Sequence, residues 1–137
     1  MPDEVVVDAS VVAKLFISED GSDAARAFAD SDVRFVAPDF VLVELTNVAV
    51  KRLRRREISR ELAERMTATS RSLFRELASA GSLMGRAFEL AADHGLSTYD
   101  AVYVALGEAR GCDVITSDSQ LIARAAAAGL SVAVRKP

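Results

Sequence analysis

Residues 96–118 read Leu-Ser-Thr-Tyr-Asp-Ala-Val-Tyr-Val-Ala-Leu-Gly-Glu-Ala-Arg-Gly-Cys-Asp-Val-Ile-Thr-Ser-Asp and carry the strongest signals of the fold class. Ser97 and Thr98 are residue types that cap helix N-termini. Apolar residues then recur at helical spacing up to Gly111, which is typical of a helix end. The next segment, 114–118, reads Val-Ile-Thr-Ser-Asp and predicts a short buried strand that ends in an acid. A helix followed by a buried strand indicates an α/β fold, in which ligands bind at the carboxyl ends of the strands.

The rest of the chain alternates strand and helix patterns. Its apolar and β-branched runs predict strands at 4–7, 33–37 and 131–134, with residues 135–137 as a solvated tail. Helical periodicity predicts helices over 11–16, 23–29, 40–53, 59–77, 84–92 and 121–128. The segment between Leu73 and Gly81 also admits a short strand. We therefore expect a three-layer α/β/α sandwich with a central, mostly parallel sheet of four or five strands, built as one domain over residues 1–137.

Two helices carry predictions about burial. The 40–53 helix, with Asp39 as its expected cap, is apolar nearly all round, which indicates burial in this fold or against a partner chain. Tyr99 and Tyr103 stand at helical spacing among apolar neighbours and are predicted to be core residues. A basic run spans the end of the 40–53 helix: Lys51, Arg52, Arg54, Arg55 and Arg56. It either binds along an RNA backbone or is a solvated helix end, where cations favour the negative end of the helix dipole.

The composition of the 137 residues bounds the class of protein. Half of the residues are hydrophobic, 27% are charged, and the formal net charge is −3. That charge offers no global attraction for nucleic acid, so any such binding needs a local patch or bound metal. Cys112 is the single cysteine, which excludes a disulfide or a cysteine zinc site within the chain. Acids near the N-terminus and the lack of a membrane-length apolar run predict a cytoplasmic protein with no membrane association.

Four acids occupy positions that an α/β fold brings to one edge. Asp8 and Asp118 end predicted strands and Asp100 opens a helix, and strand ends and helix starts share an edge of a parallel sheet. Glu44 lies in an apolar helix, where a carboxylate is costly unless it is paired or bound to metal. Each acid also has a plain structural explanation. Asp8 and Asp118 suit helix caps, and Asp100 suits the third position of a capping box that begins at Ser97. Glu44 can share a solvent-facing helix edge with Asn47 and Lys51.

Convergence of these carboxylates has a chemical consequence. Two like charges ~4 Å apart repel by ~4 kcal/mol at an effective dielectric constant of ~20, so the acids become protonated or hold a cation. The donors are oxygens, because the chain has one histidine and one cysteine. Mg²⁺ or Mn²⁺ is therefore favoured over zinc. An acid-rich site of this kind suits phosphoryl chemistry.

The motifs resemble the PIN domain family, and among its members the VapC toxins of bacterial toxin–antitoxin pairs. The resemblance rests on Asp8 in Val-Asp-Ala-Ser, Glu44 near Asn47, Tyr-Asp-Ala-Val-Tyr at 99–103, and Thr-Ser-Asp at 116–118. It implies a metal-dependent endoribonuclease whose Mg²⁺ or Mn²⁺ ligands are Asp8, Glu44, Asp100 and Asp118. It also implies a helper hydroxyl at Thr116, an auxiliary Ser10, an RNA substrate, a cognate antitoxin and a homodimer.

Two other functions remain open from the sequence. A receiver-like signalling domain, phosphorylated on an aspartate, also uses acids at strand ends and Mg²⁺. It needs adjacent acids after the first strand and a lysine at the end of a late strand, whereas Ala9 follows Asp8 and Lys136 lies in the tail. The second alternative is a PIN fold that has lost catalysis and serves as a scaffold. Apolar faces over 40–50 and 62–74 independently predict a dimer surface.

Overall fold

A computed structural model describes residues 3–137 of the chain. Its strands are β1 (Glu4–Val7), β2 (Arg34–Pro38), β3 (Phe74–Ala78), β4 (Val114–Ile115) and β5 (Val134–Arg135). Its helices are α1 (Ala9–Phe16), α2 (Ser22–Ala29), α3 (Val41–Arg54), α4 (Arg60–Thr69), α5 (Met84–His94), α6 (Thr98–Arg110) and α7 (Ser119–Ala128). Two 3₁₀ turns, η1 (Ser70–Leu73) and η2 (Ala80–Leu83), flank β3.

The five strands form a parallel sheet in the order β3-β2-β1-β4-β5. The central strand β1 is a run of valines that is buried on both faces of the sheet, as its β-branched composition predicts. Val6 pairs with Val36 of β2 on one side and Val114 of β4 on the other. The predicted parallel sheet of four or five strands is confirmed.

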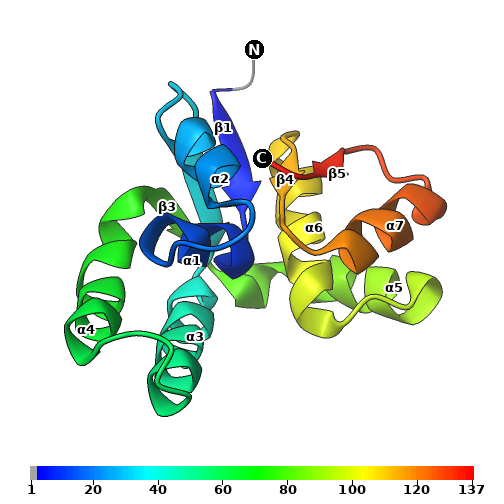
Figure 1. Ribbon diagram of the computed structural model, residues 1–137. Coiled ribbons are helices and arrows are strands. Elements are labelled where there is room, and N and C mark those ends of the chain that lie inside the picture. The colour runs from blue at the N-terminus through cyan, green and yellow to red at the C-terminus, as the bar shows by residue number, and fades with distance from the viewer. Residues whose placement is uncertain (1–2) are drawn as a thin grey trace.

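Helices cover both faces of the sheet, with α1 to α4 on one side and α5 to α7 on the other (Figure 1). The change of side follows from the strand order. The chain moves outward from β1 through β2 to β3, then crosses back through α5 and α6 to β4 on the far side of β1. The order therefore reverses between β1 and β4, and the crevice at the carboxyl ends of two such strands is where open α/β sheets bind ligands.

The segment 59–77 differs from the predicted single helix. Ser59 does cap a helix, because its hydroxyl accepts from the amide of Leu62, but α4 ends at Thr69. The chain then passes through η1 into β3, which pairs with β2 at Ala37↔Leu77. The apolar residues of this segment satisfy helical spacing, but the edge of the sheet offers them backbone pairing that an exposed helix lacks. The short strand that the sequence also admitted is the one that forms.

Helix α3 differs in both its cap and its burial. Asp39 does not cap it, since Phe40 holds the N-cap position without a side-chain hydrogen bond and the Asp39 amide pairs with Ala78 at the sheet edge. The buried residues of α3 are Val41, Leu45 and Ala49, whereas Val43 is 70% exposed. The prediction of burial within the fold is therefore wrong for one face of α3.

The last strand is also shorter and later than predicted. It comprises Val134 and Arg135, and the Arg135 guanidinium pairs with Asp113 at 3.0 Å. Arg135 is therefore held against the sheet and is not part of a solvated tail. Within residues 3–137, no helix has the length and apolar character needed to cross a membrane.

Candidate active site

Asp8 lies at the carboxyl end of β1 and is 8% exposed. Its Oδ1 caps α1 by accepting from the amides of Ser10 and Val11, so the cap interpretation is correct. The same oxygen accepts from the Ser10 hydroxyl, and Oδ2 accepts from the Thr116 hydroxyl. Burial raises the pKa of the Asp8 carboxyl, and these hydrogen bonds oppose the shift only in part. Asp8 therefore has both a structural role and an unfavourable buried charge.

The segment after β4 is joined to Asp8 by two hydroxyl groups. The fully buried Thr116 donates to Asp8 and accepts from the amide of Asp118 at 3.1 Å. The Ser10 hydroxyl accepts from the amide of Ser117 at 3.0 Å while it donates to Asp8. Oδ1 of Asp118 caps α7 through the amides of Gln120 and Leu121, so this aspartate too is a helix cap. The ends of β1 and β4 are thus held in register by predicted site residues.

Glu44 projects from α3 towards α6 and is half-buried. Its Oε1 accepts from the Tyr103 hydroxyl at 2.5 Å, whereas Asn47 and Lys51 are exposed. The solvent-facing edge proposed for these three residues therefore does not include Glu44. Burial raises the pKa of the Glu44 carboxyl, and the bond from Tyr103 opposes that shift. Burial beside Glu44 also raises the pKa of Tyr103 far above its usual range, so its hydroxyl remains a donor.

Tyr103 is the site residue that sequence reasoning missed. Tyr103 is buried, as its helical spacing predicts, and its hydroxyl group also fixes Glu44. The available signal was its position three residues after Asp100, which places both on one side of α6. Tyr99 is 61% exposed and stacks edge-on against Phe40 at 5.4 Å, so its predicted core position is wrong. The first turn of α6 is exposed, and helical periodicity does not show which turn of a helix leaves the core.

Asp100 lies in the first turn of α6, where the Ser97 hydroxyl accepts from its backbone amide at 3.1 Å. Its side chain is half-buried. Burial raises the pKa of the Asp100 carboxyl, and the negative charge of Asp118 adds to the shift. Asp100 in turn raises the pKa of Asp8, and both of them raise the pKa of Glu44. All four acids therefore belong to one chain of repulsive interactions.

The side chains of this acidic site are linked pairwise and do not surround one point. Within the part of the chain that the structure describes, no three carboxylate, histidine or cysteine groups stand together as a ready metal-binding cluster. The chemistry of the donors nevertheless fits a hard divalent cation. Every donor is a carboxylate or hydroxyl oxygen, and three carboxylates carry raised pKa values that a nearby cation would reverse.

Glu44→Gln is expected to stabilise the metal-free protein at pH 8, because the amide keeps an acceptor for Tyr103 and removes a repelled charge. The folded-state pKa of Glu44 is raised, so its ionised form destabilises the fold above that pKa. As the pH falls through the raised pKa, wild-type Glu44 is protonated and the stabilisation by the substitution disappears. Urea unfolding in EDTA at pH 8 and pH 4.5 measures the difference.

Glu61→Gln is the matched control, since Glu61 is exposed on α4. It should change the free energy of unfolding by no more than ~0.5 kcal/mol at either pH. An equal effect of the two substitutions at pH 8 would show that Glu44 is not under electrostatic strain.

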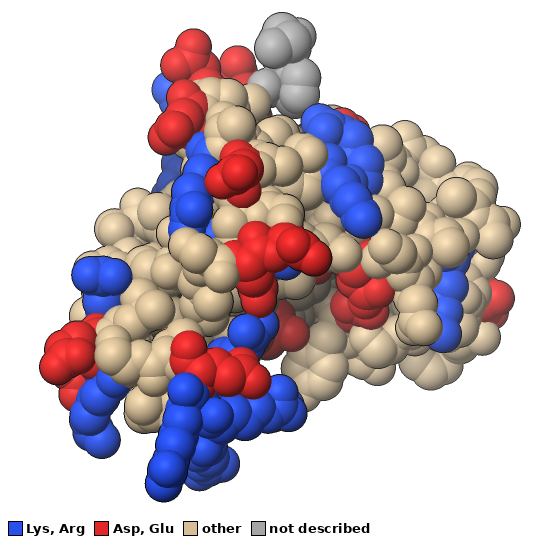
Figure 2. Space-filling model, viewed as in Figure 1, with Lys and Arg blue, Asp and Glu red and all other residues tan. Residues whose placement is uncertain are grey.

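The five basic residues at the end of α3 point to different sides of the helix. Figure 2 shows Lys and Arg side chains gathered at this end of the molecule, with acidic side chains in the hollow beside it. Lys51, Arg52 and Arg55 line a pocket that also contains Asp118. Arg54 instead lines an apolar depression on the opposite side of α3, and Arg56 lies in the turn that follows. The structure therefore brings only part of the run next to the acids.

A five-stranded parallel sheet with acids at the switch point between β1 and β4 defines the PIN class of α/β proteins. The sequence matches the PIN domain family over residues 5–128, and the chain belongs to this family. The resemblance drawn from the motifs is thereby confirmed.

The chain is also similar to individual members of this family and to individual solved structures. The chain is 33% identical to Ribonuclease VapC3 of Pyrobaculum aerophilum over 120 residues, which cover 86% of this chain and 92% of the relative. The fold is similar to that of PAE2754 from Pyrobaculum aerophilum, with a TM-score of 0.73 and 22% identity over 96% of this chain and 83% of that one. It is also similar to a chain of a toxin-antitoxin complex from Klebsiella pneumoniae, with a TM-score of 0.60 and 17% identity over 87% and 90% of the two chains.

Proposed function

We propose that this protein is a divalent-metal-dependent endoribonuclease that acts as the toxin of a toxin–antitoxin pair. The observation that carries the proposal is the set of four carboxylates near the switch point of the sheet, in which Asp100 repels the other three and Asp8 also repels Glu44. Membership of the PIN family and similarity to a protein named as a ribonuclease support the same activity. We also propose that residues 1–137 form a single domain. We propose that the protein acts in the cytoplasm, where its RNA substrate is found.

Asp8, Glu44, Asp100 and Asp118 are the proposed ligands of Mg²⁺ or Mn²⁺. When bound, the ion would neutralise charge on the phosphodiester and lower the pKa of a water molecule beside it. The chain's own residues position the carboxylates. Thr116 and Ser10 fix Asp8 through their hydroxyl groups, and Tyr103 fixes Glu44. The Coulomb repulsion among the acids in the metal-free protein favours uptake of a cation.

The partners follow from the family and from the surface. A cognate antitoxin is proposed to place a segment over the acidic groove. A homodimer is proposed because Leu42, Val43 and Val50 line an exposed apolar depression on α3. Light scattering after size exclusion should give the mass of two copies at micromolar concentration. A strict monomer would remove the dimer proposal.

The ribonuclease proposal is tested with single-stranded RNA labelled at one end. Cleavage is expected with Mn²⁺ and should stop when EDTA is added, because the acids alone cannot stabilise a second negative group in the site. Cleavage should return when Mn²⁺ is supplied in excess of the chelator. Hydrolysis that continues in EDTA would contradict the role of the metal, and inert RNA in every condition would favour the scaffold alternative.

A further inference from the structure

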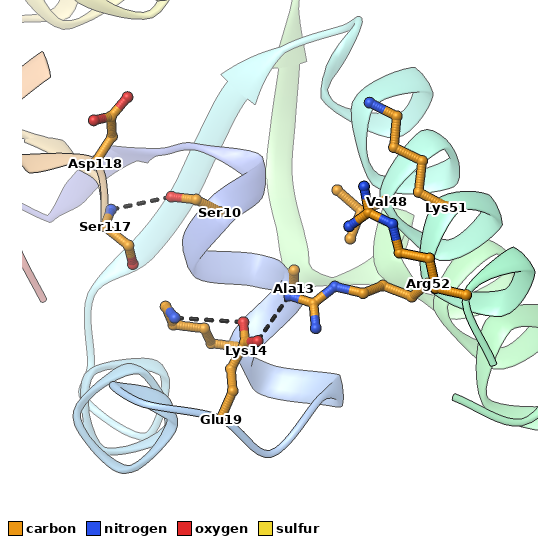
Figure 3. Close-up of a pocket in the computed structure, with 10 residues that line it drawn as sticks. Ser10, Ala13, Lys14, Glu19, Val48, Lys51, Arg52, Ser117 and Asp118 are labelled. Atoms are coloured by element: carbon orange, nitrogen blue, oxygen red, sulfur yellow. Dashed lines mark hydrogen bonds and ion pairs between the residues drawn. The ribbon is translucent and has the colours of Figure 1, made fainter. Parts of the chain in front are cut away.

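A pocket of ≈ 310 Å³ lies next to the acidic site, between α1, the end of α3 and the segment after β4 (Figure 3). It shares two residues with the site just described, Ser10 and Asp118. Its other lining residues are Ala13, Lys14, Glu19, Val48, Lys51, Arg52, Arg55 and Ser117. A phosphodiester placed among the catalytic acids would therefore have this pocket directly along its path.

The pocket contains more basic than acidic side chains, and only some of the basic ones form ion pairs. Four basic side chains face two acids, which leaves a local excess of positive charge in a protein of net charge −3. Glu19 takes two of the cations: its carboxylate pairs with Arg52 at 2.7 Å and with Lys14 at 3.4 Å, as Figure 3 shows. Lys14 also donates to the carbonyl oxygen of Asp20, and Arg52 pairs with Glu57. These two cations are structural.

Lys51 and Arg55 are the remaining cations. Neither forms an ion pair with any residue among 3–137, and both are exposed at the end of α3. They stand four residues apart, so they lie on the same face of the chain as α3 closes. Two like charges on one face repel each other unless an anion lies between them. The pocket therefore has one pair of cations without an anionic partner.

We propose that this pocket binds a backbone phosphate of the RNA next to the scissile one, with Lys51 and Arg55 as its contacts. The Glu19 ion pairs hold Lys14 and Arg52 in the wall of the pocket, and Ala13 and Val48 supply apolar lining. Binding there fixes the direction in which the strand crosses the acids. This inference rests on the proposed ribonuclease activity and adds to it the site that positions the substrate.

RNA is favoured over an acidic polypeptide because of what borders the pocket. Asp118 and Ser10 belong to both the pocket and the acidic site, so any occupant must continue into the region where a phosphodiester reacts. RNA carries a phosphate at every nucleotide, so one phosphate can lie in the pocket while the next lies among the acids. An acidic peptide offers the same charges but has no group to place among the acids, and it becomes an outcome of the test.

The experiment uses the full chain in EDTA, where binding occurs without cleavage. A fluorescent single-stranded RNA is titrated with wild type and with Lys51→Ala/Arg55→Ala over a range of NaCl concentrations. Loss of one phosphate contact should weaken binding about 10-fold at low salt and reduce the slope of log K against log[salt] by ~0.7. With Mn²⁺, the same variant should raise KM about 10-fold and leave kcat within about 3-fold, since neither residue touches the reacting atoms.

Arg60→Ala/Arg65→Ala is the matched control, because it removes two exposed cations from α4, outside the pocket. The proposal is overturned if both double variants give the same affinity and salt slope. It is also overturned if Lys51→Ala/Arg55→Ala loses binding to poly-glutamate while its RNA binding equals that of the control. Failure of wild type to cleave with Mn²⁺ would instead reject the ribonuclease, which keeps the two outcomes separate.

Discussion

Asp100→Asn is expected to lower the rate of RNA cleavage by at least ~100-fold while the protein remains folded. The carboxylate of Asp100 repels those of Asp8, Glu44 and Asp118, so Asp100 is the central member of the acidic site. Removal of a residue that only supports a metal ligand typically costs 10–100-fold, and loss of a ligand should cost at least the upper value. The measurement is single-turnover cleavage of labelled RNA in Mn²⁺.

Asp93→Asn, an equal change of charge on the exposed face of α5, is the control and should leave the rate unchanged. Thermal unfolding in EDTA separates chemistry from folding. Because the Asp100 carboxyl has a raised pKa, its neutral replacement should keep or raise Tm at pH 8. If Asp100→Asn cleaved RNA within 3-fold of wild type, Asp100 would not be a ligand of the catalytic metal.

Gly107→Ala is expected to destabilise the protein by about 1–3 kcal/mol. Gly107 is buried where α6 packs against β4, and a Cβ there would lie 2.7 Å from Val114 Cγ2 and 3.0 Å from the carbonyl oxygen of Cys112. Val114 is a stiff, fully buried residue of the sheet, so it cannot move away without disturbing β4. This cost exceeds the ~1 kcal/mol that alanine gains over glycine in a helix.

Gly85→Ala tests the explanation with the opposite sign. Gly85 lies in the first turn of α5, and nothing stands within 4 Å of its added Cβ. This substitution should stabilise the protein by up to ~1 kcal/mol, which raises Tm by about 4 °C for a chain of this size. Chemical unfolding of both variants decides the matter. A stabilising Gly107→Ala would show that α6 and β4 are not in close contact.

Much of this fold can be read from the sequence because its strongest signals are local. The β-branched run before Asp8 and the Val-Ile pair before Thr116 mark β1 and β4, the two strands at the switch point, and both are found. Ser97 and Gly111 bound α6 as predicted, since a hydroxyl cap and a left-handed glycine are features of single positions. Once the strands are inferred to be parallel, the acids at strand ends and helix starts must lie at the same edge of the sheet, because all the strands run in one direction.

The parts that could not be predicted depend on contacts between distant segments. Whether 70–78 continues a helix or joins β2 is decided by the free edge of the sheet, which no local pattern reveals. The same holds for α3, where an apolar sequence gives a face with Val43 exposed. The hydrogen bond from Tyr103 to Glu44 spans 59 positions in the chain. The sequence marks Glu44 as a candidate site residue and Tyr103 as a core residue, but it does not reveal that the two are paired.

The proposed activity depends on the binding of a divalent ion by the linked carboxylates. Calorimetric titration of Mn²⁺ into the metal-free protein at pH 7.5, with Asp100→Asn beside wild type, measures this binding. We expect saturable binding by wild type and at least ~10-fold weaker binding by the variant, because Asp100 is one of the proposed ligands. An absence of binding at millimolar Mn²⁺, or equal affinity of the two proteins, would contradict it.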